Sequence, residues 1–277
     1  MASAFMSSFL RSLVLMFGVA IQVSAQTNNQ SSSGPNDHSQ LAVAIQNPFA
    51  SLYTLPIQNN LGLEYGTNGG VQNITNLQPV IPFHISERWK LLTHPIIPLA
   101  YTSWPEKQFG LGDINFEAAF SDITHRGWVL GFGIISGFPT ATNEAFGTGK
   151  WTIGPLLGAF HQYGNWTVSL LLTQEWSYAG DASRSLVSTM QLQPNINYNF
   201  KDGLYLFTNP QITANFIAEE GQQWIVPVGV GLGKVFSVSQ QKMSLSLESY
   251  RNVVRPDVGP ATSFVLTLQL LFPRQVW

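Results

Sequence analysis

Apolar and polar residues alternate along most of this chain, and this pattern limits its fold more than any other feature. The clearest run covers residues 191–200, where five amide side chains at odd positions oppose apolar side chains at even positions: Gln191, Gln193, Asn195, Asn197 and Asn199 against Leu192, Pro194, Ile196, Tyr198 and Phe200. Alternation at every second residue places the two sets on opposite faces of a β-strand. Five amides are too polar for a sealed core, so this face is expected to meet water.

Composition narrows the class of protein further. Charged residues make up 10% of the chain, against roughly 25% in ordinary soluble domains. A helical membrane protein would need stretches of roughly eighteen apolar residues, and the sequence has none beyond its first 25 residues. We therefore predict an all-β fold, a closed antiparallel transmembrane β-barrel whose outer face meets lipid. The net charge of −2 gives no basic surface for a nucleic-acid partner. The sequence has no cysteine, so a disulfide or a thiolate site is excluded.

The first 25 residues have the pattern of a signal peptide. Arg11 precedes an apolar run from Leu13 to Val23, and the small residues Ser24 and Ala25 precede Gln26. The apolar run is shorter than the roughly twenty residues of a spanning helix, although a retained N-terminal anchor is the alternative. We expect residues 26–52 to be a flexible linker with a short helix or plug over 41–52, and residues 53–277 to form the barrel.

Turn residues divide the rest of the chain into about twelve alternating runs, an even number as in bacterial barrels. The runs begin near Asn60, Ile74, Trp89, Gly110, Trp128, Trp151, Trp166, Leu186, Leu204, Gln223, Lys242 and Ser263. The links between them alternate, short at 86–88, 122–126, 163–165, 201–203 and 237–240, and mostly longer at 67–73, 103–109, 139–150, 178–185, 218–222 and 252–262. Short periplasmic turns and longer external loops are typical of outer-membrane barrels, and an even strand number predicts that both termini are periplasmic.

Tryptophans lie at the ends of these runs, where lipid headgroups would be. Amphipathic rings prefer that level of a membrane, and they form two girdles around a barrel. The candidate girdle residues are Trp89, Trp128 and Trp166 at the periplasmic end, and Trp104, Trp151, Trp176 and Trp224 at the external end.

The link at residues 201–203 predicts how its two strands pair. A three-residue loop that ends in a left-handed glycine is a common hairpin connection, and it places Phe200 opposite Leu204. The same register sets Gln193 against Gln211, Asn195 against Asn209 and Pro194 against Pro210. A turn at residues 86–88 likewise sets Pro79 against Pro95. Eight prolines lie inside the predicted strands, and each lacks the backbone N–H that a strand ladder needs. Where two prolines face each other, the missing hydrogen bonds are expected to gather at one shared kink.

Strand direction and side-chain parity predict which polar residues face the lumen. Four carboxylates turn inward near the external end, with one basic neighbour, so we expect an acidic upper lumen that favours cations. The alternative is that some of them pair with Lys150 or Arg251, or lie in solvent at the rim, where salt screens them. The candidate lumen-lining residues are Glu64, Asp113, Glu175, Glu248, Lys150, Gln191, Gln193, Asn195, Asn197, Asn209 and Gln211.

No residue pattern indicates a catalytic site. The glycine-rich segments 147–150 and 229–234 lack the spacing of a phosphate-binding loop. The five histidines lack metal-ligand spacing, and no serine sits between glycines as a nucleophile would. The sequence therefore predicts no catalytic residue, no metal site, no cofactor and no enzymatic activity.

Several short segments resemble those of one family of bacterial outer-membrane proteins. They are LQPVIPF at 77–83, GLGD at 110–113, PTAT at 139–142, GTGKW at 147–151, VPVGVGLGKVF at 226–236 and RPDVGP at 255–260. The family is similar to the transporters of the MetA-type phenol-degradation group, and its members often carry the transferred label neuromedin U. The resemblance covers about residues 46–273 and departs at 274–277, which follow the expected Leu271-Phe272-Pro273 ending. It implies a barrel that transports small, hydrophobic or aromatic compounds, and it supplies no functional residues.

The combined prediction is a channel or transporter in the outer membrane of a Gram-negative bacterium. Its expected partners are outer-membrane lipid, a small-molecule solute and the barrel assembly machinery. Two alternatives stay open. A lipid-acting enzyme would need a nucleophile and a base near one rim, and a structural or adhesive barrel would need longer external loops.

Overall fold

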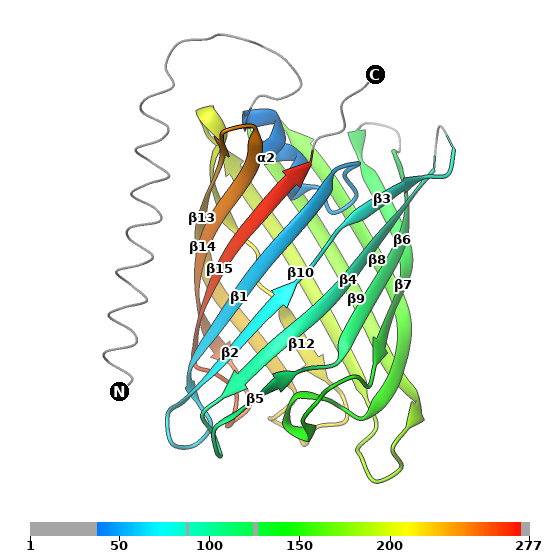
Figure 1. Ribbon diagram of the computed structural model, residues 1–277, viewed down its shortest axis with the longest axis vertical. Coiled ribbons are helices and arrows are strands. Elements are labelled where there is room, and N and C mark those ends of the chain that lie inside the picture. Colours follow the sequence, from blue (N-terminus) through cyan, green and yellow to red (C-terminus); the bar gives the residue numbers. More distant parts are fainter. Residues whose placement is uncertain (1–37, 87–88, 124–126, 273–277) are drawn as a thin grey trace. The chain divides into compact units, whose positions relative to one another are not determined.

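The computed structural model describes residues 38–86, 89–123 and 127–272, so the predicted signal peptide lies outside the described residues. One α-helix, α2 (His38–Gln46), precedes fifteen strand segments (Figure 1). The strands are β1 (Tyr53–Tyr65), β2 (Gly70–Leu77), β3 (Ile81–His84), β4 (Lys90–Thr102), β5 (Gln108–Leu111), β6 (Ile114–Ile123), β7 (Val129–Phe138), β8 (Lys150–Tyr163), β9 (Trp166–Gly180), β10 (Ser188–Asn199), β11 (Leu204–Thr208), β12 (Ile212–Asn215), β13 (Trp224–Val238), β14 (Gln241–Val254) and β15 (Thr262–Phe272). Two single 3₁₀ turns are η2 (Glu144–Phe146) and η3 (Lys201–Gly203).

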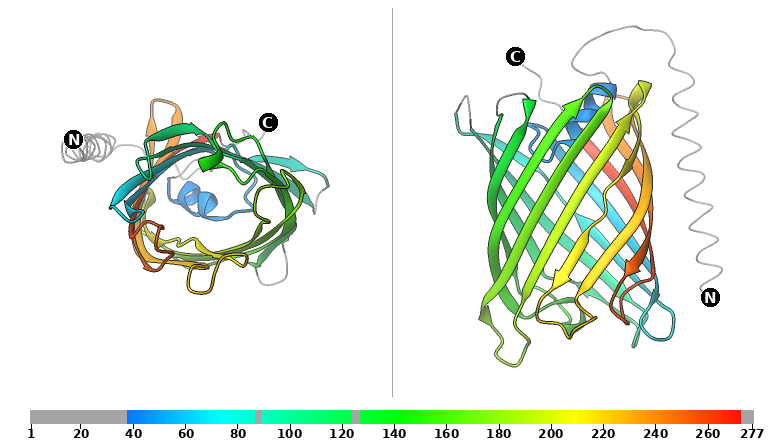
Figure 2. Two further views of the ribbon diagram at one scale, coloured as in Figure 1. Left: turned by 90° about the horizontal axis from the view of Figure 1, so that it is seen from below. Right: turned by 180° about the vertical axis from the view of Figure 1, so that it is seen from behind.

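The strands form one closed antiparallel barrel (Figure 2). Its wall has twelve strands, because β2 with β3, β5 with β6, and β11 with β12 each form one interrupted strand. The ring closes where the first strand pairs with the last, Tyr53 opposite Phe272, and every neighbouring pair is antiparallel. The predicted fold class is therefore confirmed. The first strand begins at Tyr53, seven residues before the expected position, and the helix begins three residues before the expected one.

Prolines explain two of the three interruptions without any change of register. The pairs Leu192↔Ile212 and Ile196↔Thr208 flank the break in β11–β12 and share one register, which sets Pro194 opposite Pro210 as predicted. The pairs Leu77↔Ile97 and Ile81↔Thr93 flank the break between β2 and β3 and set Pro79 opposite Pro95. Proline has no N–H to donate to a ladder, so each facing pair leaves a gap in the hydrogen bonds while the strands stay aligned.

The hairpin at η3 has the predicted geometry. Asp202 and Gly203 both adopt the left-handed conformation, with φ of 58° and 75°, and the Phe200 N–H donates to the Leu204 carbonyl at 2.8 Å. This closes the hairpin with Phe200 opposite Leu204. A shift by one residue would turn every amide of β10 toward the outer face.

The two faces of the wall differ in polarity as the alternation requires. In β8, Trp151, Ile153 and Leu157 are exposed on the outer face, while Thr152 and Leu156 between them are buried inside. Neighbouring β7 presents Phe132, 52% exposed, in the same outer layer. The outer surface of the barrel is therefore apolar, as a lipid-facing surface is. No helix within the described residues is long and apolar enough to cross a membrane.

The two ends of the barrel are different, and we name them by their connections. The turn end carries short links such as residues 164–165, 201–203 and 239–240, and α2 lies there (Figure 1). The loop end carries the longer links, among them residues 139–149, 181–187 and 255–261. The chain enters and leaves the barrel at the turn end, since Tyr53 pairs with Phe272.

Residues 38–52, which we call the plug segment, fill the turn end of the barrel (Figure 2). Leu41, Ala42 and Leu52 are buried in a cluster with four residues of the wall, Tyr205, Phe207, Val235 and Leu271. On the other side, Phe49 is only 3% exposed and lies against Gly131 and Gly158, where an added Cβ would come within 2.1 and 2.4 Å of its ring. Two wall glycines therefore form the notch that accepts this ring.

Replacement of Gly203 should measure how tightly the η3 hairpin packs on α2. Gly203→Ala and Gly164→Ala both place a side chain at positive φ, which costs roughly 1–2 kcal/mol. At Gly203 the new Cβ would also lie 2.8 Å from His38 Cβ and 2.9 Å from the Val235 carbonyl, whereas Gly164 has open space. We expect the larger loss of unfolding free energy for Gly203→Ala in urea titrations of the lipid-embedded protein. Equal losses would show that the plug segment does not press on this hairpin.

Candidate functional site: the barrel lumen

The candidate site is a cavity of about 560 Å³ inside the barrel. Its floor, on the side of the turn end, is the plug segment, with Ile45, Gln46, Pro48 and Phe49 in the lining. A smaller cavity of about 190 Å³ shares Gln58, Gln193 and Glu248 with it and includes Pro260 of the loop end. The lumen is thus hollow above a filled floor.

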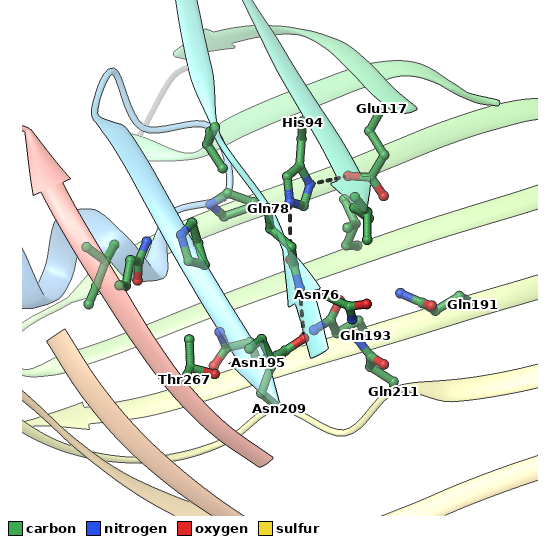
Figure 3. A pocket seen from close by; sticks show the side chains of 18 of the residues that line it. Asn76, Gln78, His94, Glu117, Gln191, Gln193, Asn195, Asn209, Gln211 and Thr267 are labelled. Carbon is green, nitrogen blue, oxygen red and sulfur yellow. Dashed lines mark hydrogen bonds and ion pairs between the residues drawn. The ribbon is translucent and has the colours of Figure 1, made fainter. Parts of the chain in front are cut away.

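The strand register brings most of the predicted lumen-lining residues to this cavity (Figure 3). Eight of the eleven line it: Glu175, Glu248, Gln191, Gln193, Asn195, Asn197, Asn209 and Gln211. The alternation along β10 carries four of them, because odd-numbered residues face inward while Ile196 is 45% exposed on the outer face. Sequence reasoning missed the amides of the opposite wall, Gln58, Asn76, Gln78 and Gln269, although they follow the same alternation in β1, in β2 and the break after it, and in β15.

A buried glutamine fastens the floor to the wall. Gln46 is 5% exposed, and its side-chain nitrogen donates to Asn199 Oδ1 at 2.8 Å. Its oxygen accepts from Asn199 Nδ2 at 3.1 Å and from the Thr167 hydroxyl at 2.5 Å. Three hydrogen bonds satisfy most of this amide, so the wall holds the end of α2 in one position.

A second polar network, which the sequence did not predict, crosses the wall above the floor. His94 Nδ1 lies 2.9 Å from Glu117 Oε2, and its Nε2 lies 3.2 Å from Gln78 Oε1. Gln78 in turn donates to Gln58 Oε1 at 2.9 Å. Figure 3 shows His94 between Gln78 and Glu117. Parity could have found Glu117, since Asn115, Glu117 and Ala119 alternate with apolar neighbours in β6 and all three line the cavity.

The remaining carboxylates of the cavity pair with hydroxyl groups and with no cation. Glu175 Oε2 accepts a hydrogen bond from the Thr152 hydroxyl at 2.6 Å. Glu248 is 4% exposed, and its Oε2 accepts from the Tyr250 hydroxyl at 2.6 Å. No lysine or arginine of the described chain lines either cavity. Three carboxylates therefore give the cavity an acidic lining, since Glu117 lines it as well.

The structure corrects the placement of Glu64. A bulge between Leu63 and Tyr65 shifts the register, and Glu64 itself has φ of 55°. Its side chain is 57% exposed and forms an ion pair with Arg251 at 3.0 Å, rather than lining the lumen. Simple alternation fails here because the bulge adds a residue and turns the side chain away.

Asp113 and Lys150 lie at the loop end, outside the cavity lining. Asp113 accepts hydrogen bonds from the backbone N–H groups of Ala141 and Thr148, which anchors loop 139–149. Lys150 is buried, and its Nζ donates to the Asp181 carbonyl at 2.5 Å. The hydroxyl and backbone N–H of Ser183 hold the pKa of the Asp181 carboxyl below its usual value. Both predicted lumen residues therefore organise the rim loops.

The candidate girdle tryptophans fall into two groups. Five are 38–50% exposed on the barrel: Trp128 and Trp166 toward the turn end, and Trp151, Trp176 and Trp224 toward the loop end. Trp89 is half-buried and contacts the outer-face ring of Phe132 edge-on, with centroids 6.0 Å apart. Trp104 is half-buried and packs edge-on against Tyr65, so it belongs to the loop packing.

Comparison with known proteins supports the fold alone. No protein-family model matches the chain, and no curated protein sequence does either. The solved structure of an outer membrane channel from Pseudomonas putida F1 superposes with a TM-score of 0.64 at 15% identity, covering 80% of this chain and 96% of that one. The NanC porin superposes with a TM-score of 0.51 at 9% identity, covering 80% and 100%. The chain is thus similar in architecture to outer-membrane barrels, and no finding bears on the phenol-degradation or neuromedin U names.

Neutralising the three cavity carboxylates should reduce cation preference. In planar bilayers under a salt gradient, we expect the reversal potential of Glu117→Gln/Glu175→Gln/Glu248→Gln to shift toward the value of an unselective pore, because acidic linings attract cations. Glu64→Gln is the matched control, since its exposed carboxylate already pairs with Arg251 and is screened within about 10 Å at 0.1 M salt. A triple variant with the wild-type reversal potential would rule out these carboxylates as the selectivity determinant.

Proposed function

We propose that this protein is a channel or transporter that lets small solutes cross the outer membrane of a Gram-negative bacterium. The observation that carries the proposal is a closed barrel with an apolar outer face and a polar cavity inside it. A closed ring with a lipid-compatible exterior is suited to a membrane, and a hollow polar interior is suited to aqueous solutes. The likeness in fold to an outer membrane channel and to a porin supports the same function.

The plug segment sets the width of the path in this proposal. A barrel of eight strands is filled by its own side chains, whereas one of sixteen or more leaves an open channel. Twelve strands leave space that Phe49, Gln46 and the α2 helix partly fill at the turn end. Passage therefore depends on how much room the plug segment leaves, or on its displacement.

The finer parts of the proposal concern location, processing and cargo. We propose that residues 1–25 are removed as a signal peptide, that residues 26–37 continue as a linker, and that the barrel assembly machinery inserts residues 53–277 with the turn end in the periplasm. The apolar part of the cavity lining, with Phe49, Leu92 and Leu156, supports passage of small compounds with hydrophobic or aromatic parts.

The two alternative functions have less support from the described residues. A lipid-acting enzyme requires a nucleophile next to a general base, and the His94 of the cavity pairs with Glu117 and Gln78 rather than with a serine. At the turn end His38 Nε2 does lie 2.8 Å from the Ser237 hydroxyl, but Lys242 Nζ donates to the same hydroxyl at 3.0 Å, which opposes its action as a nucleophile paired with this histidine alone. A structural or adhesive barrel would carry its contacts in long loops, and the longest described loop, residues 139–149, is anchored by Asp113.

Liposome swelling tests both the channel and the plug. Purified full-length protein should make liposomes permeable to small solutes, and Gln46→Ala/Phe49→Ala should speed the swelling at least severalfold, because the variant loses three hydrogen bonds and the ring that fills the notch. Gln162→Ala changes an exposed glutamine at the same end and should behave as wild type. No swelling by any of the three proteins would contradict a channel.

Cysteine labelling tests the orientation. A cysteine at Thr148, in a loop-end connection, should react with a membrane-impermeant maleimide on whole cells, because the longer loops of such barrels are external. A cysteine at Asp202, in the η3 turn, should react only after the outer membrane is opened. Labelling of Asp202→Cys alone on intact cells would reverse the proposed orientation.

A further inference from the structure

Seven amide side chains of the cavity lining have no side-chain hydrogen-bond partner among residues 38–86, 89–123 and 127–272. They are Asn76, Asn115, Gln191, Gln193, Asn209, Gln211 and Gln269. Each amide offers two N–H donors and one carbonyl acceptor. Other amides of the barrel, such as Gln46 and Asn199, form hydrogen bonds with each other. The cavity therefore holds several amide donors and acceptors that a solute could use.

These amides come from opposite sides of the barrel. Gln191 and Gln193 belong to β10, whereas Asn76 belongs to β2, which lies six places away in the ring of twelve strands. Figure 3 shows Asn76, Gln193 and Gln211 directed into the same cavity. A solute in this space therefore has amides of both walls around it.

The charge of the lining limits the class of solute. Glu117, Glu175 and Glu248 line the cavity, and none of the described lysines or arginines does. A negatively charged solute would meet these carboxylates with no lysine or arginine in the lining, and like charges repel more strongly in a medium less polar than water. An uncharged solute avoids this repulsion.

The floor and the wall next to it are apolar. Phe49, Leu92 and Ala119 pack as one buried cluster with Leu156, and Leu171 packs against them. All five line the same cavity as the amides, and Leu171 lies directly opposite Gln193 in the strand register. A solute with a ring would contact this surface with its carbon face while its polar edge reaches the amides.

We propose that the cavity is a binding site for uncharged ring compounds that carry several hydroxyl groups. This inference rests on the proposed channel function and names the solute class of the same lumen. A hydroxyl group both donates and accepts a hydrogen bond, as an amide does, so several hydroxyls on one ring satisfy amides of both walls. Each such contact displaces a water molecule from a polar group and replaces its hydrogen bond.

The test compares three probes on full-length protein in planar bilayers: glucose, benzyl alcohol and gluconate. We expect glucose to reduce the ion current in a saturable way. Gluconate is an open-chain anion, and benzyl alcohol has a ring but only one hydroxyl. We therefore expect each to bind at least about fivefold more weakly than glucose, because the first carries a negative charge and the second loses several hydrogen bonds. Equal or weaker block by glucose than by either of the other probes would overturn the inference.

Substitutions of the cavity amides test whether these side chains cause the block of the ion current by glucose. Gln193→Leu/Gln211→Leu on one wall and Asn76→Leu on the other should each weaken glucose block at least about fivefold. Gln174→Leu is the matched control, because Gln174 of the neighbouring strand bonds to the Glu175 carbonyl and Ser188 and does not line the cavity. An unchanged salt conductance shows that each variant is folded. Wild-type block in both cavity variants, or equal weakening by Gln174→Leu, would overturn the inference.

A second measurement separates this inference from the proposed function. Saturation-transfer NMR on detergent-solubilised protein reports glucose binding whether or not the barrel conducts. Glucose signals that vanish in the cavity variants, together with a protein that neither conducts nor swells liposomes, would reject the channel and keep the binding site. A protein that conducts but gives no glucose signal would reject the binding site and keep the channel.

Discussion

Closure of the backbone hydrogen-bond ring is the constraint on which the rest of this structure depends. A strand edge that faces lipid leaves N–H and C=O groups unsatisfied at several kcal/mol each, so a membrane barrel can have no edge. Here the ring closes through β1 and β15 and through β9 and β10, with the same antiparallel sense throughout. Once the ring is closed, the register of each strand is fixed by its neighbours, because a one-residue shift would exchange the inward and outward side chains of that strand. The apolar exterior and the amide-rich interior both follow from this one register.

Closure also creates the interior problem that the plug segment solves. Twelve strands enclose more space than the wall side chains fill, and an apolar void of that size would be unstable. The turn end is filled by residues 38–52, whose apolar side chains pack on the wall and whose Gln46 bonds to Asn199 and Thr167. The loop end stays hollow, and its lining is polar enough to be hydrated. The same chain thus forms a packed turn end and a hollow, hydrated loop end, and the boundary between them is the floor of the cavity.

How much of this could be predicted from the sequence depends on whether the deciding contacts are local. The η3 hairpin was predictable, because the glycine conformation and the alternation on both sides agree on one register. Glu64 was placed wrongly, because a bulge at Leu63/Tyr65 is set by loop geometry that no alternation reveals. The sequence predicted the floor only as a short helix. Its attachment to the wall could not be predicted, because Gln46 bonds to Asn199, which is 153 residues away in the sequence. The His94–Glu117 pair was missed for a different reason: the parity of β6 turns Glu117 inward, but the prolines of β4 obscure the register that brings His94 beside it.

Those prolines are more than tolerated defects in the ladder. At the break opposite Pro194, the strand leaves both neighbours between Thr208 and Ile212, and the backbone N–H of Asn209 no longer bonds to a strand. It donates instead to the Tyr250 hydroxyl at 2.9 Å, and that hydroxyl donates to Glu248 at 2.6 Å. A donor removed from the wall thereby orients the phenol that supports a buried carboxylate of the lumen. Because a closed barrel has no edge on which to place proline, each facing pair gathers its missing donors at one place in the wall, and at this break the freed Asn209 backbone lies in the lining of the cavity.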